Sequence, residues 1–287
     1  MAMECKEFHP YPYQQFCIQH IIDHPAAGLF VDMGMGKTVM TLTAFNYLKY
    51  YAWQIQRCLV IAPKKVAEAT WRTEISGWQH LRHLRCSEVL GTATQRRAAM
   101  AVDADVYVTN RDNVQWLVKE YGKAWPFDMV VLDESSSFKN HQAKRFKALR
   151  AMRPKIKRIV ELTGTPSPHG LMDLWAQVYL LDGGQRLGRT ISVYRDMYFE
   201  PDKRSRSQIF TYKARRGAAD AIYAAISDIC ISLSSDDYLT LPDRIYDEIP
   251  VKLDGPAAAA YKRLERDALL QVCLLYTSDA ADEEDSV

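Results

Sequence analysis

The sequence contains no long hydrophobic run, which argues against a membrane-spanning protein. No stretch approaches the about 20 consecutive apolar residues that a membrane-spanning helix needs. The first residues, Met1–Phe8, include Glu4, Lys6 and Glu7 and have no apolar centre, so no secretory signal peptide is visible. We therefore expect a cytoplasmic protein that is not secreted and does not bind a membrane.

The cysteines also lack the pattern of a metal site. Six cysteines stand far apart along the chain, and none forms a CxxC pair. A structural zinc site is therefore not expected. In the cytoplasm these cysteines would stay reduced thiols.

The sequence has little net charge, but its acidic residues are unevenly distributed along the chain. The formal net charge is +2, and five acidic residues fall within the last nine positions. Without them, 37 basic residues stand against 30 acidic ones, a net charge of +7. A mildly basic body suits a nucleic-acid partner, and equally a merely solvated basic surface.

Short apolar runs alternate with longer amphipathic segments over the first 180 residues. The apolar residues of each run are continuous, as expected for parallel strands covered on both faces. The pattern predicts a doubly wound α/β domain that closes near Leu180. The predicted strands are Gly28–Asp32, Cys58–Ala62, Asp105–Thr109, Phe127–Asp133 and Arg158–Thr163; the predicted helices are Thr38–Tyr51, Lys65–Gly77, Gln95–Ala101, Asn113–Tyr121 and Gln142–Met152.

The remaining residues change character, and we divide them into three parts. Residues 183–240 are interpreted as a helical insertion or linker, with a basic exposed loop at 201–217 and helical spacing over Ala218–Leu233. In residues 241–271, Pro242 and Pro250 break any long helix over Leu241–Val251, and a helix is predicted over Ala257–Gln271. The acidic residues 272–287 lack this periodicity. We expect them to be a non-native tail, and the natural protein to continue differently beyond about Gln271.

The clearest chemical signal is the segment Gly34-Met35-Gly36-Lys37-Thr38, which follows a predicted strand and opens a predicted helix. Backbone N–H groups of such a loop bind phosphate oxygens, and glycine lets the backbone approach closely. Lys37 would reach the β- and γ-phosphates and Thr38 would ligate Mg²⁺. The strict phosphate-loop pattern has glycine where this chain has Val31, and the competing interpretation is a glycine-rich turn without function.

Two acids end another apolar strand. Asp133 and Glu134 follow Met129–Leu132 and are expected at the carboxyl edge of the sheet, where ligands of α/β folds bind. Asp133 is the candidate acid for Mg²⁺ and Glu134 the candidate base that activates water. Such a pair alone is often a solvated turn. Its position downstream of Gly36-Lys37-Thr38 in one predicted sheet favours a catalytic role.

The order of these segments resembles the superfamily-2 helicase-type ATPases, and within them the SWI/SNF-like branch, including phage-encoded members. The resemblance covers roughly residues 8–182. The matching segments are Tyr11–Gln15 (glutamine motif), Asp32–Thr38 (motif I), Leu59–Lys64 with Trp71 (motif Ia), Val108–Val114 (motif Ib), Asp133–Ser136 (motif II) and Leu162–Pro166 (motif III).

The resemblance implies the amino-terminal RecA-like lobe of an ATP-dependent nucleic-acid motor. It implies that Gln14 reads adenine, and that ATP and Mg²⁺ bind between the glutamine motif, motif I and motif II. It favours translocation along double-stranded DNA. A strand-separating DNA or RNA helicase of the same superfamily, or a non-motor ATP-binding switch, remains an alternative. The host is expected to be a bacterial or phage-infected cell, and the oligomeric state is left open.

Coupling and nucleic-acid contacts are assigned to residues at the same sheet edge. Thr163 and Thr165 would relay the nucleotide state, unless they only end a strand. Lys64 and Arg111 follow two strands and would contact a nucleic-acid backbone, unless they are merely solvated. Ser136 stands where the family has histidine, so coupling is expected to differ.

Motifs IV to VI of the second lobe are not recognisable. The segment from Asp237 to Pro242 resembles the passage into that lobe. We therefore expect residues 241–271 to be an incomplete start of it. Since the arginine finger of the family belongs to the second lobe, we expect slow ATP turnover by this chain.

Overall fold

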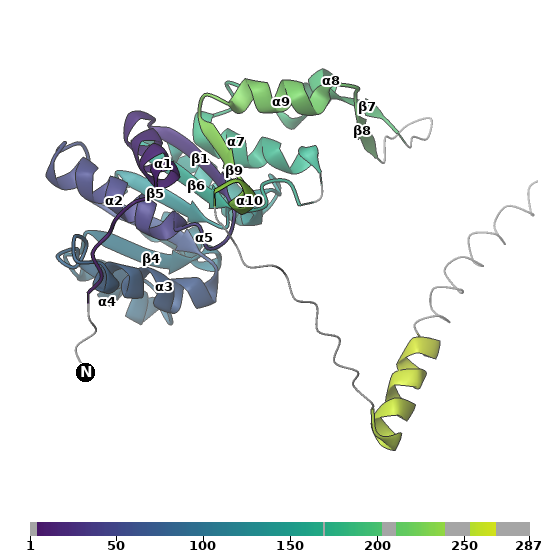
Figure 1. Ribbon diagram of the computed structural model, residues 1–287, viewed down its shortest axis with the longest axis horizontal. Coiled ribbons are helices and arrows are strands. Elements are labelled where there is room, and N and C mark those ends of the chain that lie inside the picture. The colour runs from purple at the N-terminus through teal and green to yellow at the C-terminus, as the bar shows by residue number, and fades with distance from the viewer. Residues whose placement is uncertain (1–4, 169, 203–210, 239–252, 268–287) are drawn as a thin grey trace, which may run out of the picture. The chain divides into compact units, whose positions relative to one another are not determined.

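The computed structural model describes residues 5–168, 170–202, 211–238 and 253–267. The chain forms two compact units, Met1–Thr240 and Leu241–Val287. Figure 1 shows the elements of the first unit. Its strands are β1 (Ala26–Val31), β2 (Cys58–Ala62), β3 (Cys86–Glu88), β4 (Val106–Asn110), β5 (Met129–Asp133), β6 (Arg158–Thr163), β7 (Phe199–Pro201), β8 (Tyr212–Ala214) and β9 (Cys230–Leu233). Its α-helices are α1 (Pro12–Asp23), α2 (Lys37–Tyr50), α3 (Lys64–Gly77), α4 (Ala93–Ala101), α5 (Val114–Tyr121), α6 (Lys144–Met152), α7 (Leu174–Asp182), α8 (Ile191–Tyr198), α9 (Ala218–Ile226) and α10 (Ser235–Tyr238).

Seven strands form one parallel sheet in the order β3-β4-β2-β5-β6-β1-β9. The predicted α/β class with a RecA-like parallel sheet is confirmed, and each predicted strand lies within two residues of an observed one. β6 lies between β1 and β5, with Phe30 opposite Thr163 and Asp133 opposite Leu162. This order brings the ends of β1, β5 and β6 together at the carboxyl edge of the sheet.

Helices cover both faces of the sheet, which explains its continuously apolar strands. Along β5, Met129 and Val131 pack with α1, α2 and α3, while Val130 and Leu132 pack with α5, α6 and α7. All four side chains are fully buried. Burial of this kind contributes roughly 1.5–3 kcal/mol for each large apolar side chain.

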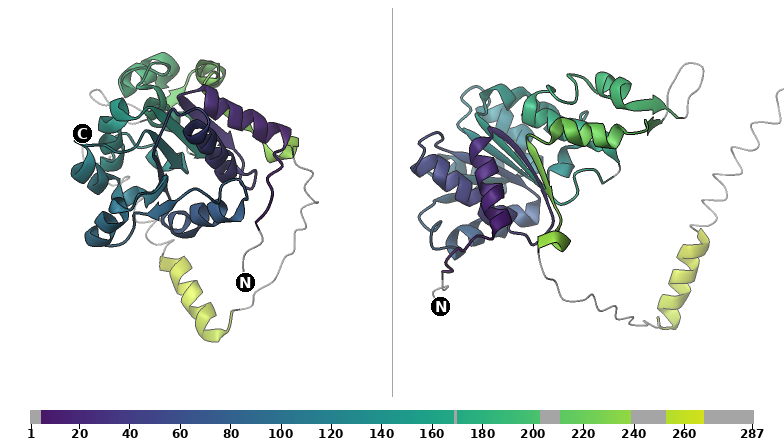
Figure 2. Two further views of the ribbon diagram at one scale, coloured as in Figure 1. Left: turned by 90° about the vertical axis from the view of Figure 1, so that its left-hand side faces the viewer. Right: turned by 45° about the horizontal axis from the view of Figure 1, so that its top comes forward.

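The strand β9 corrects one prediction from the sequence. Helical spacing was expected over Ala218–Leu233, but the helix α9 ends at Ile226 and Cys230–Leu233 is a strand paired with β1. The run is only four residues long and follows a true helix, so its periodicity is uninformative. In Figures 1 and 2, β9 runs along the edge of the sheet beside β1. The interpretation of residues 183–240 as an insertion or linker within the family plan remains a prediction.

The predicted basic loop is partly regular structure. β7 and β8 pair in an antiparallel ladder, so Pro201 and Tyr212–Ala214 lie in strands. Residues 203–210 lie outside the described residues.

In the second unit, the structure describes a helix over residues 255–267, which confirms the predicted helix up to that point. Residues 241–252 and the proposed tail, residues 272–287, lie outside the described residues. Among the helices that the structure describes, none is long and apolar enough to cross a membrane.

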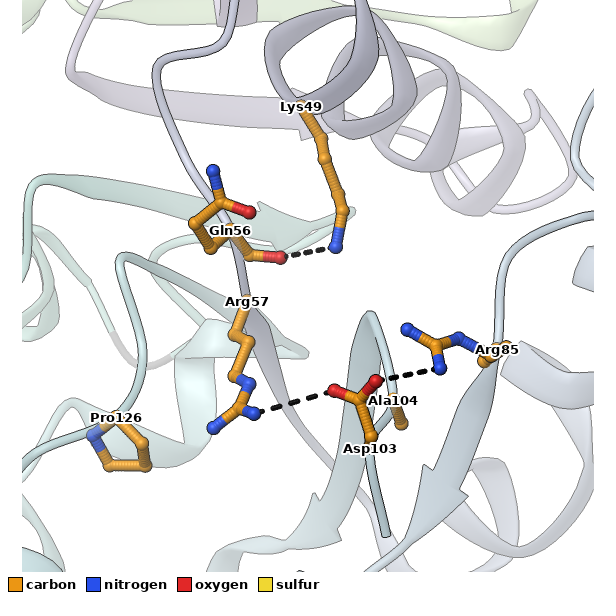
Figure 3. Close-up of a pocket in the computed structure, with 7 residues that line it drawn as sticks. All are labelled: Lys49, Gln56, Arg57, Arg85, Asp103, Ala104 and Pro126. Carbon is orange, nitrogen blue, oxygen red and sulfur yellow. Dashed lines mark hydrogen bonds and ion pairs between the residues drawn. The ribbon is translucent and has the colours of Figure 1, made fainter.

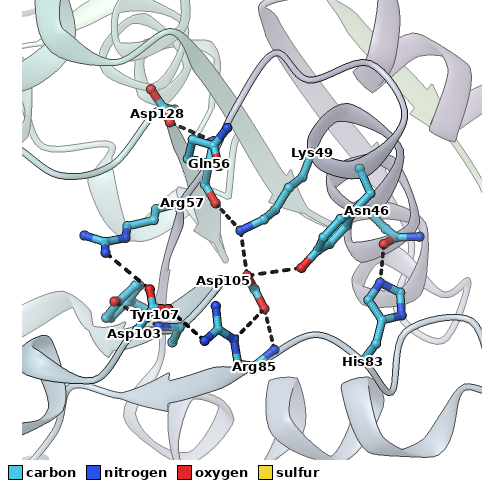
Figure 4. A network of polar contacts seen from close by, with 12 residues as sticks. Asn46, Lys49, Gln56, Arg57, His83, Arg85, Asp103, Asp105, Tyr107 and Asp128 are labelled. Atoms are coloured by element: carbon cyan, nitrogen blue, oxygen red, sulfur yellow. Dashed lines mark hydrogen bonds and ion pairs between the residues drawn. The ribbon is translucent and has the colours of Figure 1, made fainter.

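The amino-terminal edge of the main sheet is held by charged side chains that pair with one another. The carboxylate of Asp105, buried before β4, accepts hydrogen bonds from Lys49 Nζ at 2.6 Å and from the Arg85 backbone N–H at 2.7 Å (Figure 4). Beside it, Arg57 and Arg85 bind Asp103 across a pocket of about 470 Å³ (Figure 3). Burial alone would raise the pKa of Asp105, but the bonds from Lys49 and Arg85 hold it below its usual range. This network therefore fixes α2 to the amino-terminal edge of the sheet.

Candidate nucleotide-binding site

The loop between β1 and α2 has the backbone of a phosphate-binding loop. Gly34 and Gly36 have φ values of 81° and 84°, a region that disfavours residues with a Cβ. A Cβ on Gly36 would also lie 2.6 Å from the Gln14 side-chain nitrogen. The loop residues Gly34, Gly36, Lys37 and Thr38 line a pocket of about 290 Å³, which is large enough for a polyphosphate.

The glutamine motif packs directly against this loop. The Tyr13 hydroxyl and the Gln14 side-chain amide both donate to the Met35 carbonyl at 3.2 Å. The Gln14 side-chain oxygen accepts from the Tyr11 backbone N–H at 3.0 Å. Gln14 is thus beside the loop, as the resemblance requires, while its role in reading adenine remains a prediction.

Lys37, the first residue of α2, points back over the loop. Its ammonium donates to the carbonyls of Val31 at 2.8 Å and Asp32 at 3.1 Å. Burial lowers the pKa of Lys37, and the nearby carboxylates of Glu134 and Asp133 oppose that shift. The structure therefore brings Lys37 within electrostatic reach of both predicted acids, the arrangement that a phosphate–metal site needs.

Asp133 ends β5 and is held by a tryptophan from another element. The Trp71 indole N–H on α3 donates to Asp133 Oδ2 at 3.0 Å. Burial raises the pKa of Asp133, whereas the Trp71 bond and the Lys37 charge lower it. Trp71 is itself only 1% exposed, so it fixes the direction of the carboxylate. The hydroxyl of Thr38 and this carboxylate are oxygen donors of the kind that Mg²⁺ takes from proteins.

Glu134 has an uncommon backbone conformation, with φ 54° and ψ 60°. A left-handed residue other than glycine costs free energy and often marks a functional position. Here it turns the chain from β5 into the short 3-10 helix η2 (Ser135–Phe138), which contains Ser136. Ser136 is half-buried, and its coupling role remains a prediction.

A buried glutamine connects motif II to motif III. The Ser135 hydroxyl donates to Gln177 Oε1 at 2.9 Å, and Gln177 Nε2 donates to the Pro166 carbonyl at 2.6 Å. Thr163 is fully buried at the end of β6, and its hydroxyl accepts from the Thr165 backbone N–H at 3.1 Å. Thr165 is exposed. Hydrogen bonds therefore connect Ser135, which directly follows the two acids of motif II, to the loop after β6.

The two predicted nucleic-acid contacts lie just after the ends of two neighbouring strands. Lys64 follows β2 and Arg111 follows β4, and these strands pair in parallel up to Ala62 opposite Asn110. Lys64 is exposed and lies 3.9 Å from Glu68, whereas Arg111 is half-buried. The structure thus places both at the carboxyl edge, while their binding of nucleic acid remains a prediction.

Three side chains that contact or line the candidate site had no role assigned to them from the sequence. The sequence assigns Trp71 to motif Ia but gives its side chain no role, Gln177 carries no motif signal, and Glu74 of α3 lines the loop pocket. Trp71 and Gln177 lie 62 and 42 residues from their partners in motif II. Only the position of Trp71 after motif Ia gave a hint.

Comparisons with known proteins agree with these observations. A family model described as the SNF2-related domain matches residues 13–280. A phage relative, putative protein p41 of Acyrthosiphon pisum secondary endosymbiont phage 1, is 37% identical over 273 residues, covering 93% of this chain and 59% of the relative. The mouse DNA excision repair protein ERCC-6-like is 30% identical over 183 residues, covering 62% of this chain and 14% of the relative.

Two solved structures from Sulfolobus solfataricus have the same fold. The SWI2/SNF2 ATPase core in complex with double-stranded DNA matches with a TM-score of 0.65 and 24% identity, covering 82% of this chain and 47% of that one. The core domain alone matches with a TM-score of 0.62 and 26% identity, covering 93% and 54%. This chain therefore spans about half the length of these structures, and less of the mouse relative.

Proposed function

This chain belongs to the family of SNF2-related domains, and on that premise we propose that it binds Mg²⁺–ATP at the carboxyl edge of its sheet and hydrolyses it in response to nucleic acid. We propose further that the partner is double-stranded DNA and that hydrolysis drives translocation along it. The observation that carries the proposal is the convergence of Lys37, Asp133 and Glu134 beside a glycine loop with left-handed backbone.

Each residue of the site has a defined task in this proposal. Lys37 binds the β- and γ-phosphate oxygens, and the N–H groups of Gly34–Thr38 surround the phosphates. Thr38 and Asp133 hold Mg²⁺, which neutralises charge on the phosphates when bound. Glu134 orients the attacking water and accepts its proton. Gln14 selects adenine.

The Trp71 bond supports the metal role of Asp133. A carboxylate must be ionised to hold Mg²⁺, and burial works against ionisation. The indole N–H favours the charged form and also fixes its direction. One side chain thus supports both the charge and the geometry that a metal ligand requires.

The proposal of a DNA partner has weaker support than the ATP site. It draws on the related core solved with double-stranded DNA, together with the position of Lys64 and Arg111 at one edge. Ser136, Thr163 and Thr165 would pass the nucleotide state toward that edge. A motor that moves along DNA holds the backbone and does not read bases.

Calorimetry with Mg²⁺–ATP and steady-state ATPase assays test this function. We expect ATP binding, and slow turnover that double-stranded DNA increases more than single-stranded DNA or RNA does. Stimulation mainly by RNA or single strands would indicate a strand-separating helicase. Binding without stimulation by any nucleic acid would indicate a switch module, and absence of ATP binding would contradict the proposal altogether.

A further inference from the structure

The last described segment of the first unit, residues 229–238, touches both sides of the candidate nucleotide site. It comprises β9 and α10, which follow each other at the sheet edge beside β1 (Figure 1). One set of contacts reaches the phosphate loop and another reaches the glutamine motif. No task in the proposed hydrolysis requires these contacts.

The contact on the phosphate side is made by Asp32, the residue that follows β1. Its Oδ2 accepts from the Ser235 backbone N–H at 2.8 Å, from the Ser235 hydroxyl at 3.2 Å and from the Ser234 hydroxyl at 3.4 Å. These donors hold the pKa of Asp32 below its usual value, the Ser235 N–H most strongly. Asp32 therefore holds the first turn of α10 with an ionised carboxylate.

The contact on the adenine side is made by α1. The ring of Tyr13 lies 5.4 Å from the ring of Tyr238, the last residue of α10. The imidazole of His20 lies 3.1 Å from the carbonyl of Ile229, just before β9. Tyr13 also binds the Met35 carbonyl, so the same ring touches both the loop and α10.

The strand itself approaches β1 closely because Gly28 has no side chain. A Cβ at Gly28 would lie 2.7 Å from the sulfur of Cys230, its partner across the ladder. A segment packed this tightly against the strand that carries the phosphate loop will respond to movement of the loop.

We propose that Asp32 is a positioning residue that couples the phosphate loop to α10, so that nucleotide at the loop changes how firmly residues 229–238 are held. This inference rests on the proposed function. The coupling would act on the last described element of the first unit, because α10 precedes the second unit, Leu241–Val287.

The physical route runs through Lys37. Its ammonium now binds the carbonyls of Val31 and Asp32, and phosphate oxygens compete for the same donors. When the Lys37 ammonium binds phosphate, the Asp32 carbonyl loses its hydrogen bond from Lys37, while the Asp32 side chain remains bonded to α10. Nucleotide therefore loosens α10. By linkage, a change that loosens α10 beforehand strengthens nucleotide binding, at most by the factor by which nucleotide itself favours the loosened state.

The variant Ser235→Pro tests this from the side of α10. It removes the N–H and the hydroxyl that bind Asp32 but leaves the phosphate loop unchanged, and proline is well tolerated at the first position of a helix. Ser235→Ala keeps the N–H and serves as a milder second variant. Asp237→Ala is the matched control, because Asp237 is exposed on the same helix.

Hydrogen exchange of residues 229–238, with and without Mg²⁺–ADP, is measured on the whole chain together with calorimetry. We expect nucleotide to increase exchange of this segment in the wild type. We also expect Ser235→Pro to bind nucleotide at least about five-fold more tightly, Ser235→Ala to shift in the same direction, and Asp237→Ala to equal the wild type.

Two results would overturn the inference, and they differ from a failure of the proposed function. If the wild type binds Mg²⁺–ADP but exchange of residues 229–238 does not change, the coupling does not exist. Equal affinity in Ser235→Pro, Ser235→Ala and the wild type would lead to the same conclusion. If the wild type binds no nucleotide, calorimetry shows this directly, and the proposed function fails together with the inference.

Discussion

Trp71 donates its indole N–H to Asp133, with 3.0 Å between Nε1 and Oδ2. Trp71 lies on α3, the helix that follows β2, and Asp133 is the last residue of β5; β2 and β5 pair side by side in the sheet. The bond links motif Ia to the acid proposed to hold Mg²⁺. It also favours the ionised carboxylate in a position where burial opposes ionisation.

The first prediction follows from that bond. Trp71→Phe removes the donor but keeps a large apolar ring, so the pKa of Asp133 should rise further. Because an ionised Asp133 is needed for Mg²⁺, the acid limb of Mg²⁺–ATP binding should move to higher pH. On that limb, affinity should fall by about ten-fold, as expected for a lost bond to a charged group. Calorimetry from pH 5 to 8 measures this.

Trp116→Phe is the control for Trp71→Phe. The buried indole nitrogen of Trp116 has no hydrogen-bond partner among the described residues, so its loss removes an N–H without removing a bond. An identical pH profile in both variants would show that the Asp133 bond has no role in metal binding.

The second prediction concerns the phosphate-binding lysine. Lys37→Ala should lower ATP affinity by at least about ten-fold, because charge-assisted contacts to phosphate are worth roughly 1.5–3 kcal/mol each. Circular dichroism should show an intact fold, since the apolar core does not depend on this side chain. Lys119→Ala, an exposed lysine on α5, should bind ATP like the wild type. Unchanged affinity in folded Lys37→Ala would remove Lys37 from the site.

The third prediction separates binding from turnover. Glu134→Gln keeps the size of the side chain but cannot accept a proton from water. It should bind Mg²⁺–ATP as well as the wild type and reduce hydrolysis by at least about 100-fold, within the range of general-base contributions. Calorimetry and a phosphate-release assay measure the two properties. Hydrolysis at the wild-type rate would assign the base to another residue.

Much of this fold was predictable because its signals are local. Apolar runs of about five residues that alternate with amphipathic helices are typical of parallel strands buried on both faces. The phosphate loop was equally predictable, since Gly34 and Gly36 supply the positive φ angles that its backbone needs. Asp133 and Glu134 could be placed at the same edge because all strands of a parallel sheet end there.

What could not be predicted depends on contacts between distant segments. β9 is a strand because β1 lies beside it and Gly28 leaves room for Cys230. The hydrogen bonds of Trp71 and Gln177 depend on how α3 and α7 pack on opposite faces. Their partners lie 62 and 42 residues away, so no periodicity in the sequence encodes them.

The fourth prediction concerns Glu161, a fully buried carboxyl on β6. The nearby Ser135 hydroxyl donates to Gln177, so neither oxygen of Glu161 has a hydrogen-bond partner among the described residues. Burial raises the pKa of Glu161 well above its usual value. Glu161→Leu should therefore stabilise the fold at pH 7 by about 1–3 kcal/mol, the usual cost of an unsatisfied buried polar group.

The pH dependence of Glu161 has a definite sign. Above the unfolded pKa of about 4.3, the unfolded state ionises while the folded state stays neutral, so the wild type loses stability as the pH rises. Glu161→Gln should lack this loss but keep most of the polar cost. Urea denaturation at pH 5 and pH 8 measures both effects. A wild type with equal stability at the two values would show that Glu161 is already ionised in the folded protein.

The last prediction addresses the proposed DNA contacts of Lys64 and Arg111. A protein that neutralises phosphates releases counterions, so its affinity falls as salt rises, with a slope of about 0.9 per phosphate contact in duplex DNA. Lys64→Ala and Arg111→Ala should each weaken binding to unrelated duplexes to the same extent and reduce the slope by about one.

Lys123→Ala is the control, because this exposed lysine precedes β5 at the amino-terminal edge, away from the proposed contacts. Fluorescence anisotropy at two salt concentrations gives both quantities. A strong preference for one DNA sequence, or an effect of Lys123→Ala equal to those of Lys64→Ala and Arg111→Ala, would contradict a backbone-binding surface at the carboxyl edge.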